Sequence, residues 1–97
     1  MNIANIEAKD TWQSVEDLIS AATGETFTFT SGKTYHITNN NDFSVWLVNT
    51  DTAPSDKEDT GMRLPGGCQC NFQIGTYTHL YVRGNTQVAN LHIEQED

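Results

Sequence analysis

The spacing of apolar residues changes character at Gly24. Before this glycine, apolar side chains recur every three or four residues, as they do along one face of a helix. A helix is therefore predicted over residues 12–22, with Thr11 or Ser14 as its N-cap and Gly24 after its end. Its apolar face comprises Val15, Leu18, Ile19 and Ala22.

Beyond Gly24 the apolar period becomes two, which is the period of a half-buried strand. Phe27 and Phe29 alternate with threonines, and Tyr35 and Ile37 alternate with polar residues after a Ser31-Gly32 turn signal. This pattern predicts a β-hairpin over residues 25–38. Residues 43–49 are apolar at both odd and even positions, which indicates a strand in the middle of a sandwich or at an interface.

The rest of the chain consists of short strand patterns separated by turn signals. Strands are predicted over residues 62–64, 69–74, 80–83 and 87–93, the last two as a hairpin, and residues 50–60 are predicted to be an exposed loop. The expected fold is mostly β: a small antiparallel β-sandwich or barrel of about seven short strands with one short N-terminal helix.

The length of 97 residues indicates one domain. Ile3, Ile6 and Ala8 give the N-terminus a spaced apolar pattern, yet the predicted strands offer this segment no partner. We therefore expect an N-terminal arm over residues 1–10, followed by a single β domain over residues 11–97. Such arms can add a strand to the sheet edge of a neighbouring protein.

Charge excludes two classes of partner. The formal net charge is −8, from 13 acidic and 5 basic residues, and the basic residues are scattered. Nucleic acids and anionic membranes both require cationic patches, so neither is expected to bind. The N-terminus lacks the pattern of a signal peptide, and no apolar run has the ~20 residues of a spanning helix. We expect the chain to fold in the reducing cytoplasm where it is made, which suits its two cysteines.

Cys68 and Cys70 form the sharpest local motif. Two thiols on one face of a strand supply half of a tetrahedral zinc site, but zinc motifs normally place at least two residues between the cysteines. The sequence favours free thiols, at least one of them packed as a small apolar side chain, with metal binding as the weaker alternative.

His36, His79 and His92 raise the alternative of a cupin-like metal enzyme. Each histidine has an apolar neighbour in an alternating segment, and if those neighbours face the core, the histidines face solvent. The acidic loop between Asp51 and Asp56 lacks the spacing of a calcium-binding EF-hand. It is predicted to be solvated or to dock onto a partner.

Motifs of enzymatic chemistry are absent from the sequence. It contains no GxSxG nucleophile elbow, no glycine-rich phosphate loop and no dinucleotide fingerprint. We therefore predict a protein that is not an enzyme and that binds no cofactor. Tyr77 and Tyr81 are the candidates for an outward aromatic platform that stacks on sugars, although aromatic residues in small domains more often belong to the core or an interface.

Several runs of residues together form a familiar pattern over roughly residues 25–94. They are Thr11–Val15, Gly32–Asn39, Val45–Val48, Ala53-Pro54, Gly61–Gly67, Leu80–Gly84 and Val88–Ile93. The pattern resembles small β-rich accessory proteins of tailed bacteriophage virions, namely capsid decoration or cement proteins and related domains of head and tail fibres. Cys68 and Cys70 depart from it, because they occupy a turn that is usually polar.

The resemblance implies a virion location, no catalysis, and the major capsid protein or other virion proteins as partners. We expect a capsid decoration protein that assembles as a homo-oligomer, most simply a trimer. The alternative is a tail- or fibre-associated β module that binds carbohydrate. The predicted contact residues are Ile3 and Ile6 of the arm, Asp51, Pro54 and Asp56 of the loop, and Tyr81.

Overall fold

The computed structural model describes residues 1–55, 60–75, 79–85 and 87–96. Within these ranges the chain forms eight strands and one helix. In chain order they are β1 (Asn2–Ala8), β2 (Gln13–Ser14), α1 (Val15–Thr23), β3 (Thr34–Asn39), β4 (Val45–Asn49), β5 (Met62–Leu64), β6 (Gln69–Gln73), β7 (Leu80–Arg83) and β8 (Ala89–Gln95).

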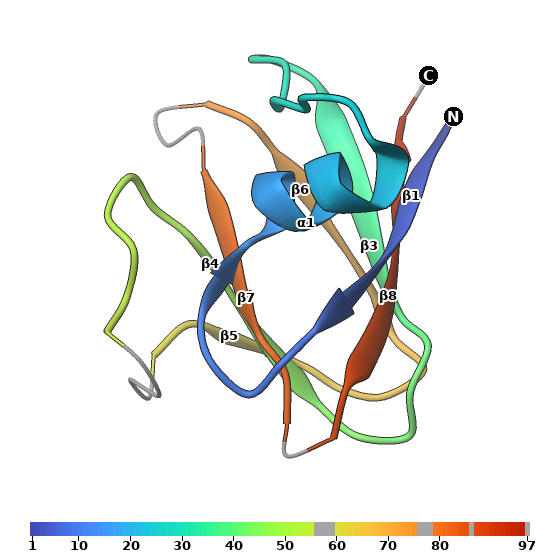
Figure 1. The fold of residues 1–97 in the computed structure, drawn as a ribbon, viewed down its shortest axis with the longest axis vertical. Coiled ribbons are helices and arrows are strands. Elements are labelled where there is room, and N and C mark those ends of the chain that lie inside the picture. The colour runs from blue at the N-terminus through green and yellow to red at the C-terminus, as the bar shows by residue number, and fades with distance from the viewer. Residues whose placement is uncertain (56–59, 76–78, 86, 97) are drawn as a thin grey trace.

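The strands form two antiparallel sheets that pack face to face. Sheet A has the order β1-β8-β3-β6, and sheet B has the order β2-β7-β4-β5. In Figure 1 the sheets lie on either side of a common interior, and α1 lies across the gap on the side where β1 and β2 are. The expected β-sandwich with one short N-terminal helix is therefore confirmed.

The helix begins three residues later than its hydrophobic pattern predicted. Ser14 is its N-cap, and the Ser14 hydroxyl accepts a hydrogen bond from the backbone N–H of Asp17 at 3.3 Å. Gly24 ends the helix in a left-handed conformation, with φ of 77°, and its N–H donates to the Ser20 carbonyl. Val15 and Ile19 are fully buried, so α1 closes the open side of the sandwich with its apolar face.

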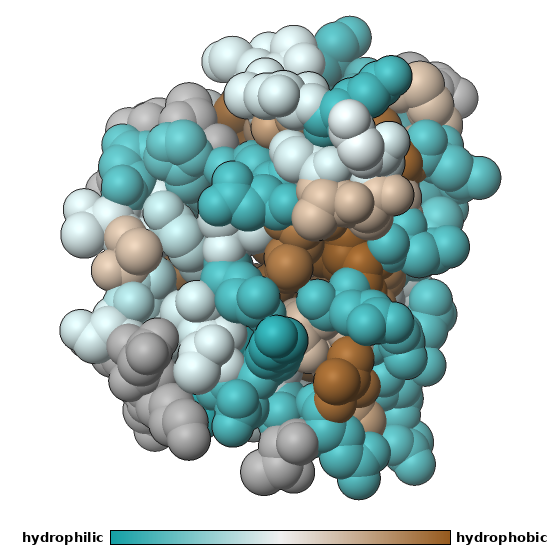
Figure 2. All heavy atoms as spheres, in the orientation of Figure 1, coloured by the Kyte–Doolittle hydropathy of each residue, from teal (hydrophilic) through white to brown (hydrophobic). Residues whose placement is uncertain are grey.

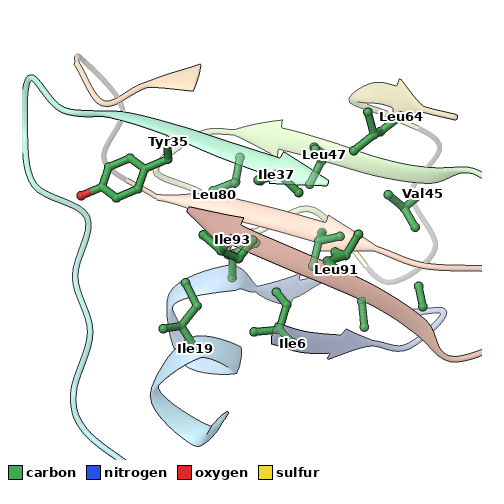
Figure 3. Close-up of a cluster of buried hydrophobic side chains, with 14 of the residues drawn as sticks. Ile6, Ile19, Tyr35, Ile37, Val45, Leu47, Leu64, Leu80, Leu91 and Ile93 are labelled. Atoms are coloured by element: carbon green, nitrogen blue, oxygen red, sulfur yellow. The ribbon is translucent and has the colours of Figure 1, made fainter. Parts of the chain in front are cut away.

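The core fills the space between the two sheets and under α1. Figure 3 shows its side chains converging from both sheets and from the helix. Its largest fully buried members are Tyr35, Ile37, Ile74, Leu91 and Ile93, together with Ile19 from α1. No helix among the described residues is long and apolar enough to span a membrane.

The N-terminal segment is part of the domain, so the predicted arm is wrong. Strand β1 pairs with β8 from Asn2 to Ala8, with a bulge between Asn2 and Ala4. Ile6 and Ala8 are buried in the core, and Ile3 is half-buried against it. Apolar residues alternate in this segment because one face of β1 packs against the core of the same domain. The pairing partner of β1 is β8, the C-terminal strand.

The predicted hairpin over residues 25–38 is only half present. Residues 34–39 form β3, but residues 25–30 join no sheet. Their backbone is bonded to side chains instead: Phe27 N–H donates to the Ser20 hydroxyl, and Thr30 N–H donates to the Tyr35 hydroxyl. Phe29 is nonetheless buried, edge-on to Tyr35. The alternation therefore correctly indicated that Phe29 is buried, but it did not indicate whether residues 25–30 pair with another strand.

The predicted final hairpin is also wrong. Strand β7 lies in sheet B and β8 lies in sheet A, so the turn after Arg83 crosses between the layers. Gly84 packs against the backbone of Lys9 there, where a side chain would be only 2.8 Å from the Lys9 carbonyl oxygen. Crossing turns of this kind separate strands that are adjacent in sequence, which spacing alone does not indicate.

A buried amide joins the two sheets at the end of β3. The Asn39 side chain is fully buried, and its Nδ2 donates to the carbonyls of Phe43, at 2.8 Å, and Leu64, at 3.0 Å. Its Oδ1 accepts from the N–H and the side-chain amide of Asn41. Gly66 lies against the same turn, where a Cβ would be 2.7 Å from the Asn41 carbonyl oxygen. Asn39 therefore fixes the position of sheet B relative to sheet A.

Candidate functional site

A buried carboxylate and a histidine form the most enzyme-like contact among the described residues. Glu16, in the first turn of α1, is only 7% exposed. His79 Nδ1–H donates to Glu16 Oε2 at 2.7 Å, and the N–H of Leu80 donates to Glu16 Oε1 at 3.0 Å. The hydrogen bond to Glu16, aided by the negative charges of Glu16, Asp51 and Asp17, raises the pKa of His79.

This pair connects α1 to the segment that begins β7. None of the hydrogen bonds formed by the described residues links the His79 ring to a serine, threonine or cysteine side chain. The Glu16 carboxylate instead satisfies the first N–H of β7 from the N-terminal end of α1, where a helix stabilises negative charge. The pair therefore fastens α1 to sheet B.

The side chains on the outer face of sheet A carry mostly amide, hydroxyl and imidazole groups. The strand register places Gln69, Thr38, His92 and Asn5 in one cross-strand row. The adjacent row comprises Asn71, His36, Glu94 and Asn2. These positions alternate with the buried residues of the same strands, so they face outward.

Most of the side chains on this face are bonded to one another. The His92 ring lies 2.6 Å from Asn5 Oδ1 and 3.1 Å from Glu94 Oε1, and the His36 ring is bonded to Asn71. Gln69 Nε2 donates to the Thr38 hydroxyl at 3.1 Å. The polar groups of this face are therefore largely occupied by neighbours across the strands.

The three histidines do not gather into a metal site. His36 and His92 lie on the outer face of sheet A, whereas His79 lies at the start of β7 in sheet B and bonds to Glu16. No group of three or more metal-binding side chains occurs in the part of the chain that the structure describes.

The outer face of sheet B has a different chemistry. Trp46 in β4 is paired with Arg63 of β5 on one side and with Arg83 of β7 on the other, so the three residues form one row. The guanidinium carbon of Arg83 lies over the Trp46 ring, 5.7 Å from its centroid. Arg63 is exposed, and its Nε donates to the Ser44 hydroxyl at 2.9 Å. Both arginines are thus held beside one aromatic ring.

The same face continues along β4 into a shallow, hydroxyl-rich pocket. Tyr81, half-buried, pairs with Val48 next to the arginine row. A pocket of about 360 Å³ follows, lined by Val48, Thr50, Thr52, Ala53, Pro54, Ser55 and Thr60. Among the predicted contact residues, Pro54 lines this pocket and Asp51 is exposed in the same loop. Asp56 and Tyr77 lie outside the described residues.

Cys68 and Cys70 differ in environment. Cys68 is exposed in the turn before β6, whereas Cys70 is in β6 and packs against the core. Burial raises the pKa of the Cys70 thiol, which keeps it neutral and unreactive. The prediction that at least one thiol packs as a small apolar side chain is confirmed for Cys70.

An apolar groove lies between α1 and β1. Figure 2 shows hydrophobic atoms exposed in a hollow between the helix and this strand. The groove has a volume of about 370 Å³ and is lined by Asn5, Ile6, Glu7, Leu18, Ala21 and Ala22. Strand β1 is the edge of sheet A on this side, so the groove runs along a strand edge. Of the predicted arm residues, Ile6 lines this groove, and Ile3 is half-buried in the same strand.

Sequence reasoning missed two of these features. The Glu16–His79 pair joins residues 63 positions apart. The only sequence signal for it is that an acidic residue, Glu16, stands next to a buried position of the helix. The row of Trp46 between two arginines depends on the order β7-β4-β5, which brings three separated segments together. Each strand carries one member of the row, and the apolar character of both faces of residues 43–49 did not show that Trp46 points outward.

Comparisons of the chain with known protein families, with curated proteins and with solved structures found no match.

Proposed function

We propose that the chain is a non-enzymatic structural protein of a tailed-phage virion, which decorates the capsid by binding the lattice of the major capsid protein. The observation that carries the binding role is the open edge of β1 beside the apolar groove. The choice of a virion lattice as the partner rests on the resemblance of residues 25–94 to virion accessory proteins.

Binding at this edge uses main-chain hydrogen bonds. An extended segment of the capsid protein adds a strand to β1, and alternate side chains of that segment enter the groove beside Leu18 and Ala22. The net charge of −8 and the exposed Glu7 favour a segment that carries basic residues. In this proposal β1 stays in sheet A and pairs with a strand of the capsid protein. It does not extend as an arm.

Repetition of the lattice suits a small oligomer. We assign a homotrimer to the bound form, with the loop that contains Asp51 and Pro54 as the contact between copies, because its described residues are irregular and mostly exposed. Several weak contacts made at once give strong overall attachment, provided that the geometry allows simultaneous binding.

The test is co-sedimentation with undecorated phage capsids, after the mass of the free protein has been measured by light scattering. Saturable sedimentation is the expected result. Ala22→Glu, which places a charge in the groove, should weaken binding while the protein remains folded. Val88→Glu, at an exposed apolar residue remote from the groove lining, is the matched control and should bind normally. A protein that never sediments with capsids contradicts the proposal.

The second candidate is a tail- or fibre-associated β module that binds carbohydrate. It is favoured by the outward position of Tyr81 and Trp46 on sheet B, since aromatic rings stack on the apolar faces of sugars. Glycan binding that is lost in Tyr81→Ala, in a protein that ignores capsids, would select this candidate over decoration.

A further inference from the structure

Among the described residues, the arginine row of sheet B brings two positively charged side chains together. The chain has five basic residues, and two of them, Arg63 and Arg83, flank Trp46 across neighbouring strands. Neighbouring strands lie ~4.8 Å apart, so the two arginine backbones are separated by only about 10 Å.

Both guanidinium groups are oriented before any ligand arrives. Arg83 lies over the Trp46 ring, and Arg63 is held by its hydrogen bond to Ser44. Ser44 therefore acts as a positioning residue for Arg63. A guanidinium presents its N–H groups as a planar fork that matches the two oxygens of a carboxylate, and an ordered fork loses less entropy on binding.

The surroundings of the row narrow the ligand class. β4 and β7 are central strands of sheet B, so this face presents side chains rather than a free main-chain edge, and an extended peptide gains no strand pairing there. Two arginines are too few for a nucleic acid, which needs several phosphate contacts at once. The adjoining pocket contributes hydroxyls from Thr50, Thr52, Ser55 and Thr60, which match the hydroxyls of sugars.

We infer that the outer face of sheet B is a binding site for glycans that carry carboxylate groups, with Arg63 and Arg83 as the carboxylate ligands. Trp46 holds the Arg83 guanidinium in place, and Tyr81 contacts the sugar ring. The threonine-lined pocket accepts the next sugar of the glycan. The inference names a ligand class for the second candidate function and rests on it, because the trimer contact assigned to the decoration protein would use the same loop.

The test uses the intact protein and three probes: oligomers of galacturonic acid, mannuronic acid and sialic acid, measured by titration calorimetry. Binding of at least one probe is expected, together with loss of binding to the same oligomer after its carboxylates are methyl-esterified. Because the site is exposed, the affinity should also fall as salt is added. Failure of all three probes, or equal binding of the esterified oligomer, overturns the inference.

Matched variants assign the binding to the row. Arg63→Gln should weaken binding about tenfold or more, which corresponds to one lost charge-assisted hydrogen-bond pair. Arg63→Lys should recover only part of that loss, because it restores the charge without the fork. Lys33→Gln removes the same charge from an exposed turn of the chain, and should bind normally. An equal loss in Lys33→Gln would reduce the effect to net charge and overturn the assignment.

Two further outcomes are informative. Preference for poly-glutamate over every glycan would replace the sugar ligand with an acidic peptide and overturn the inference. Capsid co-sedimentation by Arg63→Gln should match that of the unchanged protein, because Arg63 lies on sheet B, away from the β1 groove. Failure of capsid binding and failure of glycan binding are therefore separately visible.

Discussion

The outer faces of the two sheets have the same architecture and opposite chemistry. On sheet A the outward side chains are amides, hydroxyls and imidazoles that bond to one another across strands. On sheet B the outward side chains are two arginines around a tryptophan, with a tyrosine nearby. The polar groups of sheet A are engaged mainly with one another, whereas sheet B presents oriented cations beside an aromatic ring, a combination suited to binding carboxylates.

The comparison teaches that exposure is a poor guide to function in this molecule. Gln69 and Asn71 are more exposed than Trp46, yet their contacts are with neighbouring strands. We therefore expect changes on sheet A to alter stability and changes on sheet B to alter binding. Four predictions test this division, in order of decreasing effect.

The largest effect is expected from removal of β1. Deletion of residues 1–8 takes Ile6 and Ala8 out of the core and exposes one edge of β8. A domain of this size has about 5–15 kcal/mol of stability in total, and we expect the truncated chain not to fold cooperatively. Ile6→Ala alone should lower the free energy of unfolding by about 2–5 kcal/mol, measured by urea denaturation. A truncated chain with a sharp unfolding transition would mean that β1 is dispensable to sheet A.

The next effect is expected where the two sheets meet. Asn39→Ala leaves the buried carbonyls of Phe43 and Leu64 without the amide donor that now serves both. We expect a loss of about 2–4 kcal/mol in the free energy of unfolding, since each unsatisfied buried group costs about 1–3 kcal/mol. Asn40→Ala, at the exposed neighbouring position, is the control and should change stability by less than about 0.5 kcal/mol.

A pair of single changes contrasts the two faces directly. His92→Ala removes contacts to Asn5 and Glu94 and should cost about 0.5–1 kcal/mol of stability without affecting the affinity for acidic glycans. Arg63→Ala removes one exposed side chain and should cost less than about 0.5 kcal/mol while it weakens that affinity about tenfold or more. If both variants lose stability and neither loses binding, the division between the faces does not hold.

The smallest effect concerns pH. The hydrogen bond to Glu16 raises the pKa of His79, so the folded state binds a proton more tightly than the unfolded state does. The resulting stabilisation is fully present below the ordinary histidine pKa of 6.5 and is lost as pH rises through the raised value. Because His79 is half exposed, with 50% of its side chain accessible, the effect should be small.

The measurement is the difference in unfolding free energy between the unchanged protein and His79→Gln, from pH 5 to pH 9. The difference should be greatest at the acidic end and should shrink as pH rises. Glu16, Asp17 and Asp51 are the charged groups that favour protonation of His79. A difference that grows with pH would show that His79 is neutral in its folded environment.

The sequence alone determined the fold class and much of the burial. Alternation identified the inward positions of β3 and β7, the helical period identified α1, and Gly24 marked the end of the helix. These features are local, because an apolar face must be covered whatever covers it, and a left-handed residue after a helix favours glycine in any context. Even Phe29, outside any strand, followed its period into the core.

Only the tertiary structure decided which segments pair. β1 finds β8 at the other end of the chain, β7 and β8 separate into different sheets, and the β7-β4-β5 order assembles the arginine row. Pairing across a sandwich depends on long-range hydrogen bonds and on how two layers share one core, and the period of two is the same for every possible partner. The candidate site on sheet B follows from that pairing, which is why its residues were visible in the sequence and their association was not.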